Sequence, residues 1–163
     1  MNKIPISYVE LSMCLEDKSR EELEYYLDRE TGNIIKVDCF LMQKWEAGEE
    51  TTHEDFPDFQ KEEYDAMISV LKDSEGKRYH GIPRIWPKNE NRIIDDFINT
   101  IDNEQISEKL RKILKRPRAI MLIKDELFNQ PGMLESYYRF EEKEYRKLLE
   151  DWVKSLLIEP EWK

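Results

Sequence analysis

The sequence predicts an α+β fold in which a short antiparallel β-hairpin near the N-terminus packs on a bundle of about five helices. One observation is the segment from residue 25 to residue 37, where Tyr25 and Leu27 share one face of an extended stretch and Gly32 precedes a β-branched run. The other is the helical spacing of apolar residues from about residue 91 onward. Side chains alternate between two faces in a strand, whereas apolar residues recur about every 3.6 positions in a helix. One segment of the first kind followed by several of the second predicts this fold class.

A short helix is expected before the hairpin, because Ser7 can accept a hydrogen bond at its N-terminus and Asp17 lies near its end. The inward positions of this helix are expected to be Val9 and Met13, with Leu11 and Leu15 as further ones. In the hairpin, Asp28 can accept hydrogen bonds from backbone N–H groups two residues on. Gly32 supplies the positive φ angle that closes the short loop.

The rest of the chain is predicted to be mainly helical. Apolar stripes indicate helices over residues 61–72, 91–101, 104–114, 117–128 and 134–157. Between residues 78 and 87 the chain is expected to be extended, because Pro83 and Pro87 restrict the residues before them.

The length of 163 residues is typical of one domain, so we predict a single domain over residues 1–163 with an acidic loop or insertion at about 42–60. Residues 46–65 hold nine acidic side chains against one basic side chain, Lys61, in a chain of net charge -10. Such a stretch can engage a basic protein partner.

The composition also limits the setting of the protein. No apolar run approaches the roughly 20 residues of a membrane span, and the first residues do not resemble a secretory signal, so we expect a cytoplasmic protein. Cys14 and Cys39 lack the spacing of metal or redox pairs and are expected to be reduced thiols. Neither a cofactor nor a metal is expected, and the oligomeric state is left open.

The sequence carries no phosphate-binding glycine loop, dinucleotide fingerprint, nucleophile elbow or paired-histidine metal motif. This favours a non-catalytic interaction or regulatory protein. The alternative is a small enzyme or phosphate-ligand binder, because Arg78, His80 and Arg84 surround a Gly-Ile-Pro turn and could contact an anion. The other interpretation of this segment gives it no binding role: it is an edge strand in which Tyr79 and Ile82 are buried and His80 is exposed to solvent.

Residues 109–118 hold six basic side chains and no acidic one. Their candidate phosphate contacts are Lys112, Lys115, Arg116 and Arg118. The sequence nevertheless disfavours nucleic-acid binding, because cations are common in the last turn of a helix and no aromatic residue interleaves these.

Four segments, in this order, resemble one known family: YYLDRETG, RYHGIP, DDFINTIDNEQISEKL and IKDELFNQPGMLESYYRFEEKEYRKLLEDWVKSLLIEP. Together they are similar to uncharacterised protein family one-five-eight of the UPF series, over most of the chain from Tyr25 to Pro160. The resemblance implies a bacterial cytoplasmic protein and supplies no activity, cofactor or catalytic residue. Two departures are Pro117, where members carry a glycine-rich stretch, and Tyr137 or Tyr138, where members carry tryptophan.

Overall fold

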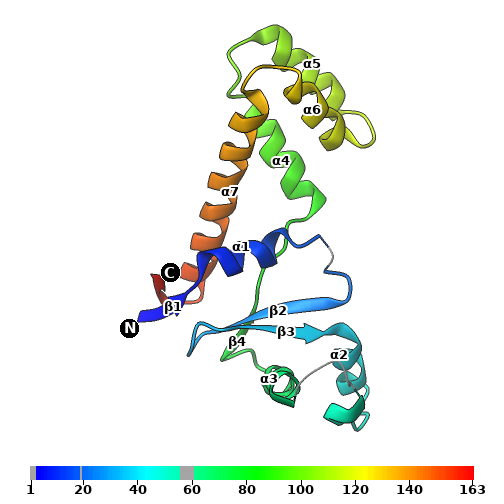
Figure 1. The fold of residues 1–163 in the computed structure, drawn as a ribbon, viewed down its shortest axis with the longest axis vertical. Coiled ribbons are helices and arrows are strands. Elements are labelled where there is room, and N and C mark those ends of the chain that lie inside the picture. Colours follow the sequence, from blue (N-terminus) through cyan, green and yellow to red (C-terminus); the bar gives the residue numbers. More distant parts are fainter. Residues whose placement is uncertain (1–2, 19, 56–60) are drawn as a thin grey trace. The chain divides into compact units, whose positions relative to one another are not determined.

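The computed structural model describes residues 3–18, 20–55 and 61–163, and the chain divides into two compact units (Figure 1). Unit 1 comprises Met1–Arg84 and Trp152–Lys163, and unit 2 comprises Ile85–Asp151. The predicted α+β class is confirmed, and of the seven α-helices in the described residues the sequence predicted all but Cys39–Glu46. The organisation as a single domain stays a prediction.

Unit 1 contains every strand of the described residues and the first three α-helices. Its elements are β1 (Lys3–Ile6), α1 (Tyr8–Glu16), β2 (Leu23–Asp28), β3 (Ile34–Asp38), α2 (Cys39–Glu46), the 3-10 helix η1 (His53–Asp55), α3 (Lys61–Lys72), β4 (Tyr79–Gly81) and β5 (Glu159–Trp162). Unit 2 is helical. It contains α4 (Pro87–Ile98), α5 (Glu104–Leu114), α6 (Ala119–Phe128) and most of α7 (Met133–Ser155).

The predicted hairpin is formed by β2 and β3, which pair antiparallel with Tyr25 opposite Lys36. The expected extended segment contributes β4, which pairs antiparallel with the other edge of β2 and gives a sheet of order β3-β2-β4. A parallel pair of β1 and β5 was not predicted. It forms because α7 ends at Ser155, before the predicted end of the last helix, and Leu157 turns the chain with φ of 58°.

Helix α1 covers one face of this sheet, and α3 lies on the other (Figure 1). Ser7 caps α1 as predicted, by accepting a hydrogen bond from the backbone N–H of Glu10. The prediction that Val9 and Met13 point inward is wrong, since these side chains are 63% and 68% exposed. The buried stripe is instead Leu11, Cys14 and Leu15, spaced by three and four positions. At about 100° per residue, Val9 and Met13 fall on the opposite side of the helix.

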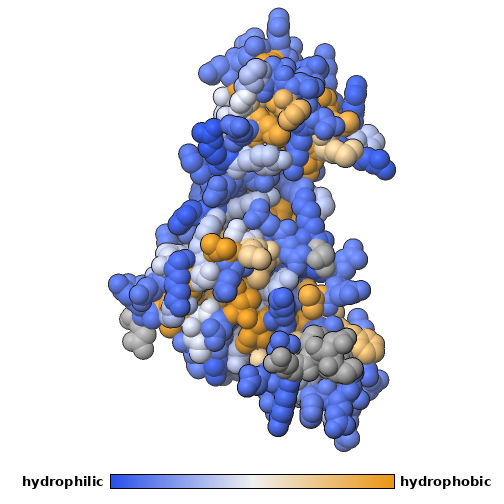
Figure 2. Space-filling model, viewed as in Figure 1, coloured by the Kyte–Doolittle hydropathy of each residue, from blue (hydrophilic) through white to orange (hydrophobic). Residues whose placement is uncertain are grey.

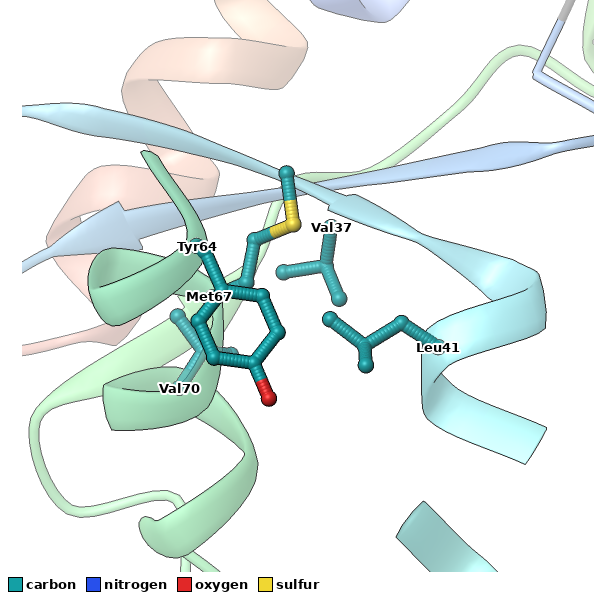
Figure 3. Packing of buried hydrophobic residues seen from close by; sticks show 5 residues of the cluster. All are labelled: Val37, Leu41, Tyr64, Met67 and Val70. Atoms are coloured by element: carbon teal, nitrogen blue, oxygen red, sulfur yellow. The ribbon is translucent and has the colours of Figure 1, made fainter. Parts of the chain in front are cut away.

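Between the sheet and α3, five side chains form a buried cluster (Figure 3). These are Val37 from β3, Leu41 from α2, and Tyr64, Met67 and Val70 from α3. The last three recur at helical spacing, so one face of α3 is buried. Tyr26 and Ile35, on the same face of the hairpin as Val37, pack against this cluster.

The predicted acidic loop at about 42–60 begins too early, because α2 extends to Glu46. Asp38 accepts hydrogen bonds from the backbone N–H groups of Phe40 and Leu41, so α2 starts directly after β3. The Tyr64 hydroxyl donates to the carbonyl oxygen of Thr51 at 2.9 Å and ties the acidic segment to α3. Residues 56–60 of the predicted loop lie outside the described residues.

In unit 2, α4 begins at Pro87, one turn earlier than predicted, because proline is well suited to the first helical position. Ile93, Ile94, Phe97 and Ile98 form its buried face. Helix α5 matches its predicted range. Helix α6 starts at Ala119 rather than at Pro117, because Arg118 adopts a left-handed conformation with φ of 57°.

Gly32 and Gly48 give a matched test of how the hairpin turn packs, since both have positive φ angles of 80° and 73°. A Cβ atom at Gly32 would overlap the carbonyl oxygen of Pro5 in β1, whereas one at Gly48 meets no atom within 4 Å. Gly48→Ala should therefore lower the free energy of unfolding by only about 1 kcal/mol. Gly32→Ala should cost about 2 kcal/mol more, because β1 must move. Urea unfolding of both variants measures the difference, and equal costs would contradict the close approach.

Candidate functional site

One polar network of unit 1 is centred on Asp28, which is only 3% exposed. Arg78 donates to both of its carboxylate oxygens, from Nε at 3.0 Å and from Nη2 at 2.8 Å. The backbone N–H of Glu30 and the hydroxyl of Thr31 donate to the same carboxylate from the hairpin turn. Burial raises the pKa of Asp28, but the hydrogen bonds from Arg78, Glu30 and Thr31 outweigh burial and lower the pKa overall.

A second network lies at the other end of β2, around Glu24. Arg20 is buried, and its guanidinium donates to Glu24 at 3.0 Å and to the carbonyl oxygens of Ile82 and Pro83, each at 2.8 Å. Glu24 also forms an ion pair with Arg84. These bonds fix the segment that follows β4 against the start of the hairpin, so Arg20 has a structural role.

The structure thus assigns carboxylate partners to both arginines of the predicted anion site. Asp28 and Glu24 are four residues apart on β2, which separates their Cα atoms by about 13 Å. Arg78 and Arg84 are therefore held at opposite ends of the strand and do not converge on one point. Binding of an anion by these residues stays a prediction that the ion pairs disfavour.

His80 lies on β4 opposite Leu27, and its side chain is half-buried rather than exposed. Its Nε2 atom is buried and has no hydrogen-bond partner among the described residues. Burial lowers the pKa of His80, and Arg29 lowers it further, while Asp73 and the carbonyl oxygen of Lys77 act in the opposite direction. The lowered pKa favours the neutral imidazole, and among the described residues no carboxylate is hydrogen-bonded to it that would orient it as a general base.

The basic run of unit 2 separates into two groups. Lys109 donates to Glu126 at 2.8 Å, and Arg111 donates to the side-chain oxygen of Asn99 at 2.8 Å. The other four side chains are exposed and form no ion pair with a described residue: Lys112, Lys115, Arg116 and Arg118. The sequence had named these four as candidate phosphate contacts, and they lie at the junction of α5 and α6.

An acidic surface occupies the α2–α3 region of unit 1. Its exposed carboxylates in the described residues are Glu46, Glu49, Glu50, Glu54, Asp55, Glu62, Glu63 and Asp65. None of them forms an ion pair with a described residue, although Asp55 accepts a hydrogen bond from the backbone N–H of Thr52. The exposed aromatic side chains of Phe40 and Trp45 lie on α2 beside this surface.

A groove of about 620 Å³ lies between α1 and the hairpin, and no pattern in the sequence predicts it. We call it the α1 groove. Its lining consists of Glu10, Met13, Cys14, Glu16 and Asp17 on one side and of Tyr25, Ile34 and Lys36 on the other. Figure 2 shows hydrophobic side chains gathered at the surface over α1 and the hairpin. A volume of about 300–1,000 Å³ is typical of binding sites for small ligands.

The chemistry of the α1 groove favours binding over catalysis. Burial raises the pKa of the Cys14 thiol to about 11, although Arg20 acts against the shift. The Tyr25 hydroxyl donates to Asp17 at 2.5 Å, and burial together with this bond raises its pKa to about 12. Both groups are protonated at neutral pH, so neither is a ready nucleophile or base.

In the described part of the chain, no helix is both long and apolar enough to cross a membrane. Within the same ranges, no group of three or more His, Cys, Asp or Glu side chains is arranged to hold a metal ion. The predictions on membrane, metal and cofactor stay predictions.

A sequence model of the uncharacterised protein family UPF0158 matches residues 55–162, about two thirds of the chain. The chain belongs to UPF0158. The match covers unit 2 completely and includes α3, β4 and β5 of unit 1, but it begins after the hairpin that the sequence resemblance had included. Neither a curated protein nor a solved structure matches the chain. Membership of UPF0158 therefore assigns no activity, and the α1 groove lies outside the matched residues.

Sequence reasoning missed Arg20 as well as the groove. The one local signal for Arg20 is its spacing of four residues from Glu24, which permits an ion pair. Arg20 also donates to the carbonyl oxygen of Cys14 at 3.2 Å, and its remaining acceptors, the carbonyl oxygens of Ile82 and Pro83, follow it by more than 60 residues. No local pattern predicts such a contact.

Asp28→Asn tests the network at the hairpin turn, because the folded-state pKa of Asp28 is lowered. Its carboxylate should contribute stability fully above the unfolded pKa of about 3.9 and lose that contribution as the pH falls through the lower folded pKa. Near pH 7, Asp28→Asn should reduce the free energy of unfolding by about 2 kcal/mol, discounted because Arg78 is partly exposed. The cost should shrink below pH 4.

The measurement is urea unfolding at several pH values, with Asp65→Asn on the exposed side of α3 as the matched control. The control should change stability by less than about 0.5 kcal/mol. A cost for Asp28→Asn that is independent of pH would contradict a charge-dependent role.

Proposed function

We propose that this protein is a non-catalytic interaction or regulatory protein whose partner is a basic protein bound at the acidic surface of unit 1. The observation that carries this proposal is the set of eight exposed carboxylates between Glu46 and Asp65, none of them paired with a described cation. Such a surface accelerates encounter with a positively charged partner and selects against acidic ones.

The aromatic side chains on α2 support the same proposal. Phe40 is 58% exposed and Trp45 is 36% exposed, although aromatic residues of this size are usually buried. Lys44 lies over the ring of Phe40 with its Nζ 5.0 Å from the ring centroid. Charged surfaces steer association, whereas buried aromatic anchors supply most of the affinity, so a partner that covers α2 would gain both.

The state of the reactive groups agrees with a non-catalytic role. Arg78 and Arg84 are paired with carboxylates, His80 is neutral and half-buried, and the thiol of Cys14 is protonated. No observation in the described residues favours the alternative of a phosphate-ligand enzyme over this proposal.

Nucleic-acid binding at the α5–α6 junction is a second candidate function, and one observation favours it. The four exposed cations of the junction have no carboxylate partner among the described residues, whereas Lys109 and Arg111 are held within unit 2. The net charge of -10 opposes binding of a polyanion elsewhere on the chain.

The acidic-surface proposal is tested with the double variant Glu62→Lys/Glu63→Lys, which reverses two exposed charges on α3. The matched control is Glu108→Lys/Glu142→Lys, which makes the same change of charge on exposed positions of unit 2. In native pull-downs from a bacterial lysate, the unaltered protein and the control should retain a basic partner that the α3 variant loses. Retention by all three proteins, or recovery of no partner at all, would contradict the proposal.

For the second candidate, Lys115→Glu/Arg116→Glu should weaken binding of a double-stranded DNA probe about tenfold or more in gel-shift assays. Lys143→Glu/Lys147→Glu, at exposed positions of α7, is the matched control and should leave binding within about threefold. Binding of the unaltered protein should fall steeply with salt, because released counterions supply the driving force. A gel shift that is absent or independent of salt removes this candidate.

A further inference from the structure

We propose that the α1 groove, together with the outer edge of β3, binds an extended segment of a partner protein that adds to the sheet as a strand and carries apolar and cationic side chains. This goes beyond the acidic surface, because the groove lies on the α1 face of the sheet whereas α3 covers the other face (Figure 1). The two proposals use different surfaces and agree only in that the protein binds another protein.

The backbone of β3 is suited to accept a further strand. The sheet order β3-β2-β4 makes β3 an edge strand, and no described strand pairs with its outer side. Asp28 N–H donates to the carbonyl of Asn33, and Cys39 N–H donates to that of Glu22. In this register the residues of β3 that form hydrogen bonds to β2 alternate with Ile34 and Lys36. The backbone N–H and C=O groups of Ile34 and Lys36 therefore point away from β2, towards the open edge of the sheet.

The side chains of these same two residues line the α1 groove. A strand added at β3 would place alternate side chains on the α1 face of the sheet, beside Ile34 and Lys36. Strand addition takes affinity from main-chain hydrogen bonds and specificity from pockets that receive alternate side chains. The open edge and the adjacent groove supply these two requirements together.

The floor and the rim of the groove indicate which side chains it receives. Cys14 and Tyr25 are buried and Ile34 is half-buried, so the floor suits an apolar side chain. On the α1 side, the carboxylates are those of Glu10, Glu16 and Asp17, against the single ammonium of Lys36 on β3. This excess of negative charge favours arginine or lysine in the segment that binds.

The apolar surface continues beyond the groove, which favours an extended segment over a small molecule. Met13 lines the groove and is 68% exposed, so the apolar surface extends outward from the groove along α1. Hydrophobic side chains gather over α1 and the hairpin (Figure 2). A segment of six residues in extended form spans about 20 Å and can cover this strip.

A second copy of the chain is a poorer occupant. Antiparallel pairing of two β3 strands would bring Lys36 of one copy towards Lys36 of the other, and like charges on paired strands are destabilising. Lysine on an edge strand is a common device against such pairing.

The experiment measures binding of a labelled peptide of about eight alternating leucine and arginine residues by fluorescence anisotropy. One arm tests charge with Glu10→Lys/Glu16→Lys. Its matched control is Glu62→Lys/Glu63→Lys, which makes the same charge change on the acidic surface. The other arm tests the edge with Lys36→Pro, which removes an outward N–H group without removing a bond of the hairpin ladder. Lys36→Gln is its matched control, and circular dichroism checks that every variant is folded.

The expected result is a loss of at least about tenfold in affinity for Glu10→Lys/Glu16→Lys and for Lys36→Pro, with both controls within about threefold. Replacing arginine by glutamate in the peptide should abolish binding. If Glu62→Lys/Glu63→Lys loses affinity and Glu10→Lys/Glu16→Lys does not, the peptide binds the acidic surface; this overturns the inference and supports the proposed function.

Two further outcomes overturn the inference. Equal binding by Lys36→Pro and Lys36→Gln would show that no strand is added at β3. Competition by 2-phenylethylamine, a small aromatic amine, as effectively as by unlabelled peptide would show that the groove binds small organic cations. Conversely, protection of the Ile34 and Lys36 amides from hydrogen exchange on peptide addition would support strand addition directly.

Discussion

Burial of the Asp28 carboxylate is the constraint on which the arrangement of unit 1 depends. A carboxylate that is 3% exposed must be fully hydrogen-bonded, and Asp28 receives bonds from its own turn and from Arg78, fifty residues later. The first set of bonds fixes the hairpin turn, and the second brings the start of β4 beside β2. Because Arg29 N–H also donates to the carbonyl of Arg78, side-chain and backbone bonds join the same two segments.

The placement of β4 has consequences on both sides of the sheet. Asp73, at the end of α3, accepts hydrogen bonds from the backbone N–H groups of Lys77, Arg78 and Tyr79, so α3 and β4 are connected by an ordered turn. At the other end of β2, Arg20 and Arg84 share Glu24. The predicted anion-binding arginines are thus part of the framework that holds the sheet together, and the partner surfaces that we propose in unit 1 are the acidic surface and the α1 groove.

The available surfaces differ in charge and in position along the chain. The α1 groove and the carboxylates of the acidic surface from Glu46 to Glu54 precede the residues matched by UPF0158, whereas those from Asp55 to Asp65 and the basic junction of α5 and α6 lie within them. A shared family property would therefore be expected in unit 2 or in β4 and α3. Interactions through the groove would belong to the N-terminal segment of this protein.

The sequence by itself determined the local structure wherever a short-range rule applied. Ser7 capping, the turn at Asp28 and Gly32, the limits of α3 and α5, and the exposed cations at residues 112–118 all follow from patterns within a few residues. It also determined the α+β class. The prediction was wrong where one segment carries two apolar stripes. In α1, Val9 and Met13 form one stripe, and they lie opposite the stripe that is buried, which consists of Leu11, Cys14 and Leu15.

Only the tertiary structure decided the pairing of β1 with β5, the partners of Arg20, Arg78 and Arg84, and the existence of the α1 groove. Each depends on contacts between residues far apart in the sequence, and no local propensity encodes them. An arginine in an extended segment has the same sequence pattern whether its side chain is available to bind an anion or is already paired with a buried carboxylate. The difference lies in the fold, which brings Arg78 to Asp28 and Arg84 to Glu24 at opposite ends of β2.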